Sequence, residues 1–200
     1  MEREISMLAL NNAMEEGKDI FLVTQRELAV ARPEESDLYA VGTVAHVLQI
    51  IKTSDSTIRV VVRGMRKGRI KRLWQTKPFL QANVTLIEDE VPGKMTSRVE
   101  AVMRQTYALL GEYKDMVPDL PDEVMATVLD SKDPGEIANY IAYSITLRHM
   151  DRQRILEELH PVKRLKLVNE ILTRELDVIS LEDTISLFRR LYRSLPSSST

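Results

Sequence analysis

The segment of the sequence best suited to binding a charged ligand is a run of basic side chains at residues 57–77. It holds 8 lysines and arginines and no acidic residue, whereas the parts of the chain before and after it each carry a net charge of −5. Alternate side chains of a strand point to the same face. Alternation therefore places Arg59 with Arg63, and Lys67 with Arg69 and Lys71, on common faces. The candidate charged-ligand surface consists of Arg59, Arg63, Lys67, Arg69 and Lys71.

Two interpretations of this surface stay open. Its cations can neutralise the phosphates of a nucleic acid, or they can form an exposed sheet face that pairs with acidic groups elsewhere in the chain. Trp74 is the single aromatic residue in the basic run, and proteins that bind single strands usually offer several rings for base stacking. The second interpretation is therefore favoured.

Catalytic constellations are absent from the sequence. A phosphate-binding loop needs glycines and a following serine or threonine, but Lys94 is followed by Met95 and residue 88 is glutamate. The three histidines fall on different expected elements, without metal-ligand spacing. No serine stands in a Gly-x-Ser-x-Gly turn, and the chain has no cysteine. The sequence predicts no catalytic residue, no metal and no cofactor.

The elements that would position the basic run change character along the chain. A helix is expected at residues 4–16, with Gly17 as its stop. Short apolar or alternating segments then predict antiparallel strands, and the later segments show helical spacing, with Asp133 and Asp151 as expected N-caps. The expected strands are 20–24, 44–51, 57–63, 69–74 and 79–87, with a hairpin turn at 52–56 and a turn or bulge flanked by Gly64 and Gly68. The expected helices are 96–113, one starting near Pro121, one after Asp133, one after Asp151, 162–178 and 181–195.

This pattern predicts an α+β protein with a β-rich domain at residues 1–92, a helical bundle at 93–195 and a disordered tail at 196–200. The chain has 200 residues, of which 44% are hydrophobic and 29% charged, enough apolar material for a core. No apolar run reaches the roughly 18 residues of a membrane span, and no secretory signal opens the chain. A cytoplasmic location without membrane contact is expected.

Several strings, taken in order, point to one family. They are DLYAVGTVA at residues 37–45, TIRVVVRGMRKGRI at 57–70, DPGEIA at 133–138 and RQRILE at 152–157. From about residue 2 to residue 185 the chain resembles the N-terminal domain of Lon, the ATP-dependent protease. Arg63 departs from the family, which has a glutamate there.

The resemblance implies a PUA-like antiparallel β domain, here expected to lack its first strands, followed by a helical bundle. It also implies a substrate-recognition and oligomerisation domain that binds unfolded or damaged proteins and is not catalytic by itself. The ATPase and peptidase motifs of the family do not occur in this sequence. The expected partners are unfolded proteins, Lon subunits or further copies of the chain. A PUA-like RNA-binding module using residues 57–77 and a stand-alone regulator of full-length Lon remain as alternatives.

Overall fold

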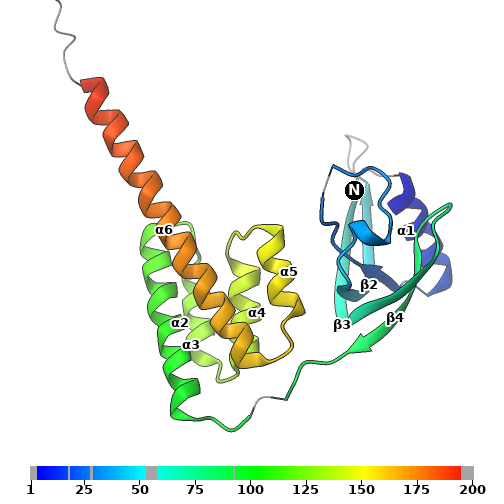
Figure 1. Cartoon of the computed structure of the whole chain (residues 1–200), viewed down its shortest axis with the longest axis horizontal. Coiled ribbons are helices and arrows are strands. Elements are labelled where there is room, and N and C mark those ends of the chain that lie inside the picture. The colour runs from blue at the N-terminus through cyan, green and yellow to red at the C-terminus, as the bar shows by residue number, and fades with distance from the viewer. Residues whose placement is uncertain (1–3, 18, 28, 53–57, 92, 195–200) are drawn as a thin grey trace, which may run out of the picture. The chain divides into compact units, whose positions relative to one another are not determined.

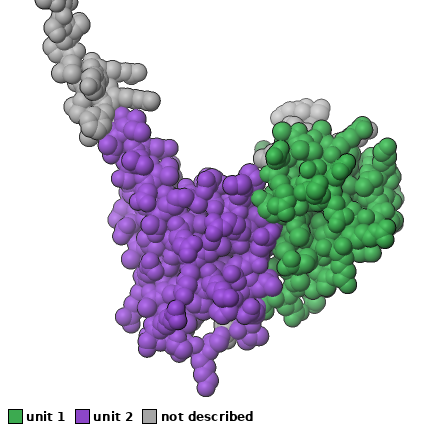
Figure 2. Space-filling model, in the orientation of Figure 1, with its two compact units in different colours: residues 1–89 green, residues 90–200 purple. Residues whose placement is uncertain are grey.

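The computed structural model describes residues 4–17, 19–27, 29–52, 58–91 and 93–194 (Figure 1). The chain divides into two compact units, residues 1–89 and 90–200 (Figure 2). Among the described residues, the first unit holds one α-helix, a short 3-10 helix and four strands, and the second holds five α-helices. The α+β prediction is confirmed. The expected hairpin turn and the C-terminal tail lie largely or wholly outside the described residues.

The first unit is an antiparallel sheet with one α-helix beside it. Helix α1 (Glu4–Glu16) ends at Gly17, whose positive φ of 121° is a conformation that glycine adopts at little cost. The strands follow in the order β1-β2-β3-β4, each antiparallel to its neighbour (Figure 1). Their bounds, with those of the short 3-10 helix η1, are β1 Asp19–Leu22, η1 Glu35–Asp37, β2 Val41–Lys52, β3 Ile58–Gln75 and β4 Gln81–Ile87.

The prediction of two separate strands is wrong, because β3 runs through Gly64 and Gly68 without a turn. The bulge expected as the alternative to a turn between these glycines is present. Met65 is skipped in the pairing of β3 with β2, which makes it a bulge. An extra residue shifts the alternation of side chains by one. Residues before and after Met65 that seem to share a face in the sequence therefore lie on opposite faces of the sheet.

Close backbone approach explains two glycines of the sheet. A Cβ at Gly42 would overlap the carbonyl oxygen of Leu22 and would lie 2.7 Å from Cζ of Phe21. A Cβ at Gly68 would overlap Cγ1 of Val84. The ring of Phe21 thus covers the sheet where both glycines lie. The buried apolar residues described in this unit are Leu10, Ala13, Leu38, Val41, Ala45 and Val47.

The second unit is all-helical, with α2 (Ser97–Met116), α3 (Asp122–Asp130), α4 (Pro134–Ser144), α5 (His149–Glu157) and α6 (Pro161–Ser194). The Asp133 side chain accepts hydrogen bonds from the backbone N–H groups of Gly135 and Glu136, so the predicted N-cap of α4 is confirmed. Helix α6 is continuous, whereas the sequence predicted two segments. The N-cap assigned to Asp151 is wrong: α5 begins at His149, and Asp151 lies buried in its first turn.

Helix α6 packs against α2 and α4, and these contacts enclose the core of the second unit (Figure 1). Leu110, Ile141, Leu165 and Leu172 have no measurable exposure. A buried polar bridge joins α2 to α6, since the Thr106 hydroxyl lies 2.7 Å from Oδ1 of Asn169. The second unit therefore has a closed core with its polar groups paired inside it.

Candidate functional site

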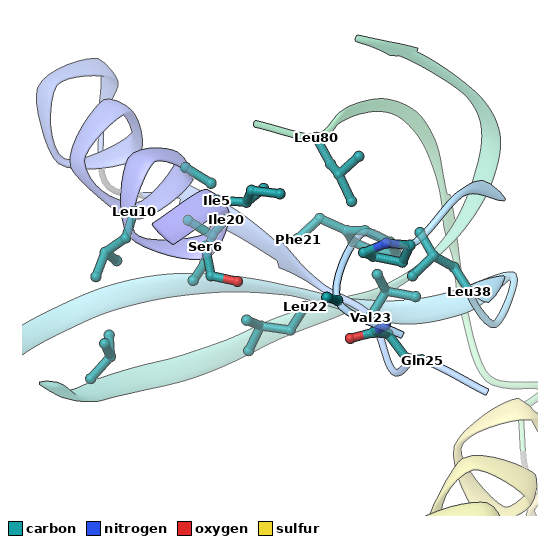
Figure 3. A pocket seen from close by; sticks show the side chains of 14 residues that line it. Ile5, Ser6, Leu10, Ile20, Phe21, Leu22, Val23, Gln25, Leu38 and Leu80 are labelled. Carbon is teal, nitrogen blue, oxygen red and sulfur yellow. The ribbon is translucent and has the colours of Figure 1, made fainter. Parts of the chain in front are cut away.

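An apolar groove in the first unit is one candidate site. Its volume is about 320 Å³, and its lining comes from α1, β1, the segment before β2, β3 and the segment before β4 (Figure 3). Among the described residues, Ser6 and Gln25 are the polar members of the lining, and none of the lining residues is charged. The other lining residues are Ile5, Ala9, Leu10, Ile20, Phe21, Leu22, Val23, Ala31, Pro33, Leu38, Val60 and Leu80.

This lining suits apolar side chains and provides no titratable group for acid–base chemistry. Beside it, β1 is an edge strand in the described sheet, because β2 is its one neighbour in the strand order. An edge strand offers backbone N–H and C=O groups to an extended peptide. The sequence analysis did not find the groove, since the lining residues come from segments far apart in the chain.

A second exposed surface lies on the β2–β3 hairpin. Arg59, Val61 and Arg63 alternate on one face, where Ile51 lies directly opposite Arg59. Exposure is 42% for Val61 and 41% for Ile51, and both arginines are exposed. We call these four residues the hairpin face. It combines apolar and cationic side chains, and Leu48, in a bulge of β2, is exposed next to it.

The remaining candidate cations lie beyond the Met65 bulge. Arg69 and Lys71 are exposed, whereas Lys67 is only partly exposed and donates a hydrogen bond to Oδ1 of Asp89 at 2.7 Å. Lys71 is itself skipped in the pairing with β4. The five candidate residues therefore do not form one continuous basic face, because the bulge moves the later ones to the opposite side of the sheet from the hairpin face.

Most of these cations form no ion pair with an acidic group of the described residues. Lys67 pairs with Asp89, but no carboxylate of the described chain lies within 4.0 Å of a charged nitrogen of Arg59, Arg63, Arg69 or Lys71. The interpretation in which the basic run pairs with the acidic remainder of the chain therefore accounts for one of the five residues.

The histidines and carboxylates of the described residues form no group of three that could hold a metal ion. His46 lies 2.7 Å from the Asp19 carboxylate at the surface, and His160 caps the first turn of α6 through a contact with the Lys163 N–H. These contacts fix local geometry and place no reactive pair in a cavity. None of the helices in the described parts of the chain is long and apolar enough to span a bilayer.

The strongest electrostatic feature is the set of ion pairs around Asp151 in the second unit, and its role is structural. The Asp151 carboxylate, 3% exposed, accepts hydrogen bonds from Arg148 at 2.9 Å and from Arg174 at 2.7 and 3.2 Å. Burial alone would raise the pKa of Asp151, but the hydrogen bonds from Arg174 and Arg148 outweigh it and hold this pKa below its ordinary value. The network fastens α5 to α6, which the sequence analysis missed by treating Asp151 as a cap.

Taken together, the described residues offer apolar and cationic surface for a macromolecule and no cluster of catalytic or metal-binding groups. Residues 1–174 match the family model of the ATP-dependent protease La (LON) substrate-binding domain. The chain belongs to this family, which is a non-catalytic part of an ATP-dependent protease.

The chain is similar to Lon proteases of several bacteria. It is 34% identical to that of Heliobacterium modesticaldum over 184 residues, which cover 92% of this chain and 22% of that protein. It is 35% identical to the Lon protease of Clostridioides difficile over 188 residues, which cover 92% of this chain and 24% of that protein. The chain thus spans less than a quarter of these relatives.

Two solved structures share the fold. The N-terminal domain of the Mycobacterium avium complex Lon protease superposes with a TM-score of 0.63 at 21% identity, covering 85% of this chain and 86% of that one. The Lon N-terminal domain protein from Xanthomonas campestris gives a TM-score of 0.54 at 16% identity, with 83% and 82% coverage. The expected resemblance to the Lon N-terminal domain is confirmed.

Proposed function

We propose that this chain recognises protein substrates for a Lon-type ATP-dependent protease by binding apolar segments exposed in unfolded or damaged proteins. The observation that carries the proposal is the apolar groove, which has room for apolar side chains and no charged lining residue. Folded proteins keep such side chains inside, so a groove of this kind discriminates between folded and unfolded chains.

The edge of β1 adds a second source of affinity. An extended substrate segment can pair its backbone with an edge strand while placing alternate side chains in a neighbouring pocket. Residues Ile20–Leu22 belong both to this edge strand and to the groove lining. Backbone pairing is independent of sequence, which suits a protein that must accept many different unfolded substrates.

The proposal is tested by light scattering after gel filtration, with a chemically unfolded model protein and its folded form. Ser6→Glu places a carboxylate in the groove lining, whereas Asn11→Glu adds the same charge at an exposed position of α1 outside it. We expect a complex with the unfolded protein only, weakened about tenfold by Ser6→Glu because an unpaired charge is costly in an apolar site. Equal binding of folded protein, or equal effects of both substitutions, would contradict the proposal.

Self-association is the second part of the proposed function, and a different feature supports it. In the later part of α6, Val178, Leu181 and Ile185 are 43%, 63% and 51% exposed, and their spacing of three and four residues is that of a coiled-coil seam. A second copy of the chain can cover such a stripe. Leu181→Gln should lower the mass measured by light scattering, whereas Glu182→Gln, at the neighbouring exposed position, should leave it unchanged.

A further inference from the structure

We infer that the hairpin face selects substrate segments in which an apolar side chain is flanked by carboxylates. This inference rests on the proposed substrate-binding function and adds a preference within it. The hairpin face places Val61 between Arg59 and Arg63 on one strand, with Ile51 beside Arg59 on the next strand. All four side chains are exposed. An apolar centre between two cations is complementary to an apolar residue between two anions.

The arginines of this face are available for a ligand. Neither Arg59 nor Arg63 forms an ion pair with a carboxylate of the described residues. The pairing register places Asp19 in line with Arg63 across the sheet, because Asp19 lies opposite His46 and His46 lies opposite Arg63. The Asp19 carboxylate bonds to Nδ1 of His46 at 2.7 Å. Each of the two guanidinium groups is therefore free to meet a ligand carboxylate of its own, and their planar forks suit bidentate pairing.

The spacing of the face defines the preferred ligand. Arg59 and Arg63 are four residues apart in a strand, or about 13 Å at 3.3 Å per residue. An extended peptide laid along β3 matches this spacing when its carboxylates occupy positions i and i+4 and its apolar side chain occupies position i+2. Contact of that side chain with Val61 excludes water near the ion pairs and strengthens them.

The composition of the face favours a polypeptide over a nucleic acid. A phosphate backbone has no use for the exposed aliphatic side chains of Val61 and Ile51, and the hairpin face holds no aromatic ring on which a base could stack. The aromatic ring of the basic run, Trp74, is exposed but comes eleven residues after Arg63, beyond the Met65 bulge. The cations and the aliphatic groups together fit an acidic, apolar peptide.

The test uses three labelled peptides with the same apolar residues, flanked at the i and i+4 positions by glutamate, glutamine or lysine. Binding is measured by fluorescence anisotropy with the full chain at two salt concentrations. We expect the glutamate peptide to bind about tenfold more tightly than the lysine peptide. The difference should shrink at high salt, because exposed ion pairs are screened.

Two double variants locate the preference. Arg59→Glu/Arg63→Glu reverses the charge of the hairpin face and should reverse the order of the peptides. Arg69→Glu/Arg72→Glu makes the same change of net charge on exposed residues beyond the bulge and should leave the order unchanged. Circular dichroism and the fluorescence of Trp74 check that each variant is folded.

Equal binding of the three peptides by the wild-type chain would overturn the inference while leaving the proposed function standing, provided that unfolded protein still binds. Loss of unfolded-protein binding as well would mean that the proposed function fails. An equal change of the relative peptide affinities in both double variants would assign the preference to net charge alone and would also overturn the inference. A single-stranded oligonucleotide that binds through Arg59 and Arg63, and is not displaced by the glutamate peptide, would identify a nucleic-acid surface instead.

Discussion

The two units of this chain bury their apolar residues to different extents. The helical unit encloses a cluster of 18 buried apolar residues among those described, and its buried polar groups Thr106 and Asn169 bond to each other. Among its described residues the sheet unit encloses six; Val61, Ile51 and Leu48 are exposed, and the apolar groove of this unit is open. The two units are of similar length, 111 and 89 residues. Their different numbers of buried apolar residues therefore reflect how each unit distributes apolar side chains between its core and its surface.

The difference indicates a division of labour. A closed core gives stability, whereas apolar surface left open is available to a ligand and contributes little to folding. We therefore expect substitutions in the core of the helical unit to change stability, and substitutions on the exposed surfaces of the sheet unit to change binding. Trp74, the one tryptophan of the chain, reports unfolding of the sheet unit by fluorescence, and far-ultraviolet circular dichroism reports mainly on the helices.

The largest effect is expected from Leu172→Ala in the core of the helical unit. Leu172 is fully buried, and its truncation leaves a cavity, so the free energy of unfolding of this unit should fall by about 2–5 kcal/mol. Chemical denaturation followed by circular dichroism measures the change. Fluorescence of Trp74 should show an unchanged midpoint for the sheet unit. A parallel shift of both signals would mean that the two units unfold as one, which would break the comparison.

Asp151→Asn should destabilise the helical unit by about 1.5–3 kcal/mol, because charge-assisted hydrogen bonds from two arginines are weakened. The lowered pKa of Asp151 also predicts how the stability of the helical unit depends on pH. Stability from this group is fully present above its unfolded pKa of about 4 and is lost as pH falls through the folded value. Denaturation of the variant between pH 7 and 2 should therefore show a shallower acid loss. Asp119→Asn, at an exposed position, is the control and should behave like the wild type.

Gly42→Ala should destabilise the sheet unit by about 1–3 kcal/mol, since the added Cβ overlaps the Leu22 carbonyl and the strands must move apart. The neighbouring strand supplies a matched control, because a Cβ at Gly64 has its nearest neighbour, Cγ2 of Thr43, at 3.4 Å. The midpoint of Trp74 fluorescence in denaturant measures both variants. Equal effects at Gly42 and Gly64 would show that close packing of β1 on β2 does not limit the stability of this unit.

Local signals in the sequence predicted much of the fold. Gly17 and Asp133 mark a helix end and a helix start by their own chemistry, and both assignments agree with the structure. Asp151 shows where such signals are ambiguous, because a carboxylate near a helix start can be a cap or a buried partner of distant arginines. The sequence cannot distinguish these roles, since Arg174 reaches Asp151 from another helix.

The candidate site was less predictable, for a related reason. Exposure of Arg59 and Arg63 on a common face follows from simple alternation. Gly64 and Gly68 signal a turn or a bulge, but the sequence does not show which of the two forms or that Met65 is the extra residue that changes the face. The apolar groove depends on α1, β1 and segments more than seventy residues apart along the chain. Such a site exists only after the sheet has formed, so apolar residues such as Val60 and Leu80 looked in the sequence like ordinary core positions.

The smallest effect on stability is expected from Val61→Thr on the hairpin face, and it gives the sharpest test of the comparison. Val61 is 42% exposed, so exchanging a methyl for a hydroxyl should change the free energy of unfolding by less than about 0.5 kcal/mol. The same exchange at Val128 in the helical core, 1% exposed, should cost about 1–3 kcal/mol because the hydroxyl is buried. Binding of unfolded protein should show the opposite order, weakened severalfold by Val61→Thr and unchanged by Val128→Thr at temperatures where that variant is folded. If Val61→Thr instead destabilised the sheet unit and left binding intact, Val61 would be a structural residue, and the division of labour between the two units would not hold at the hairpin face.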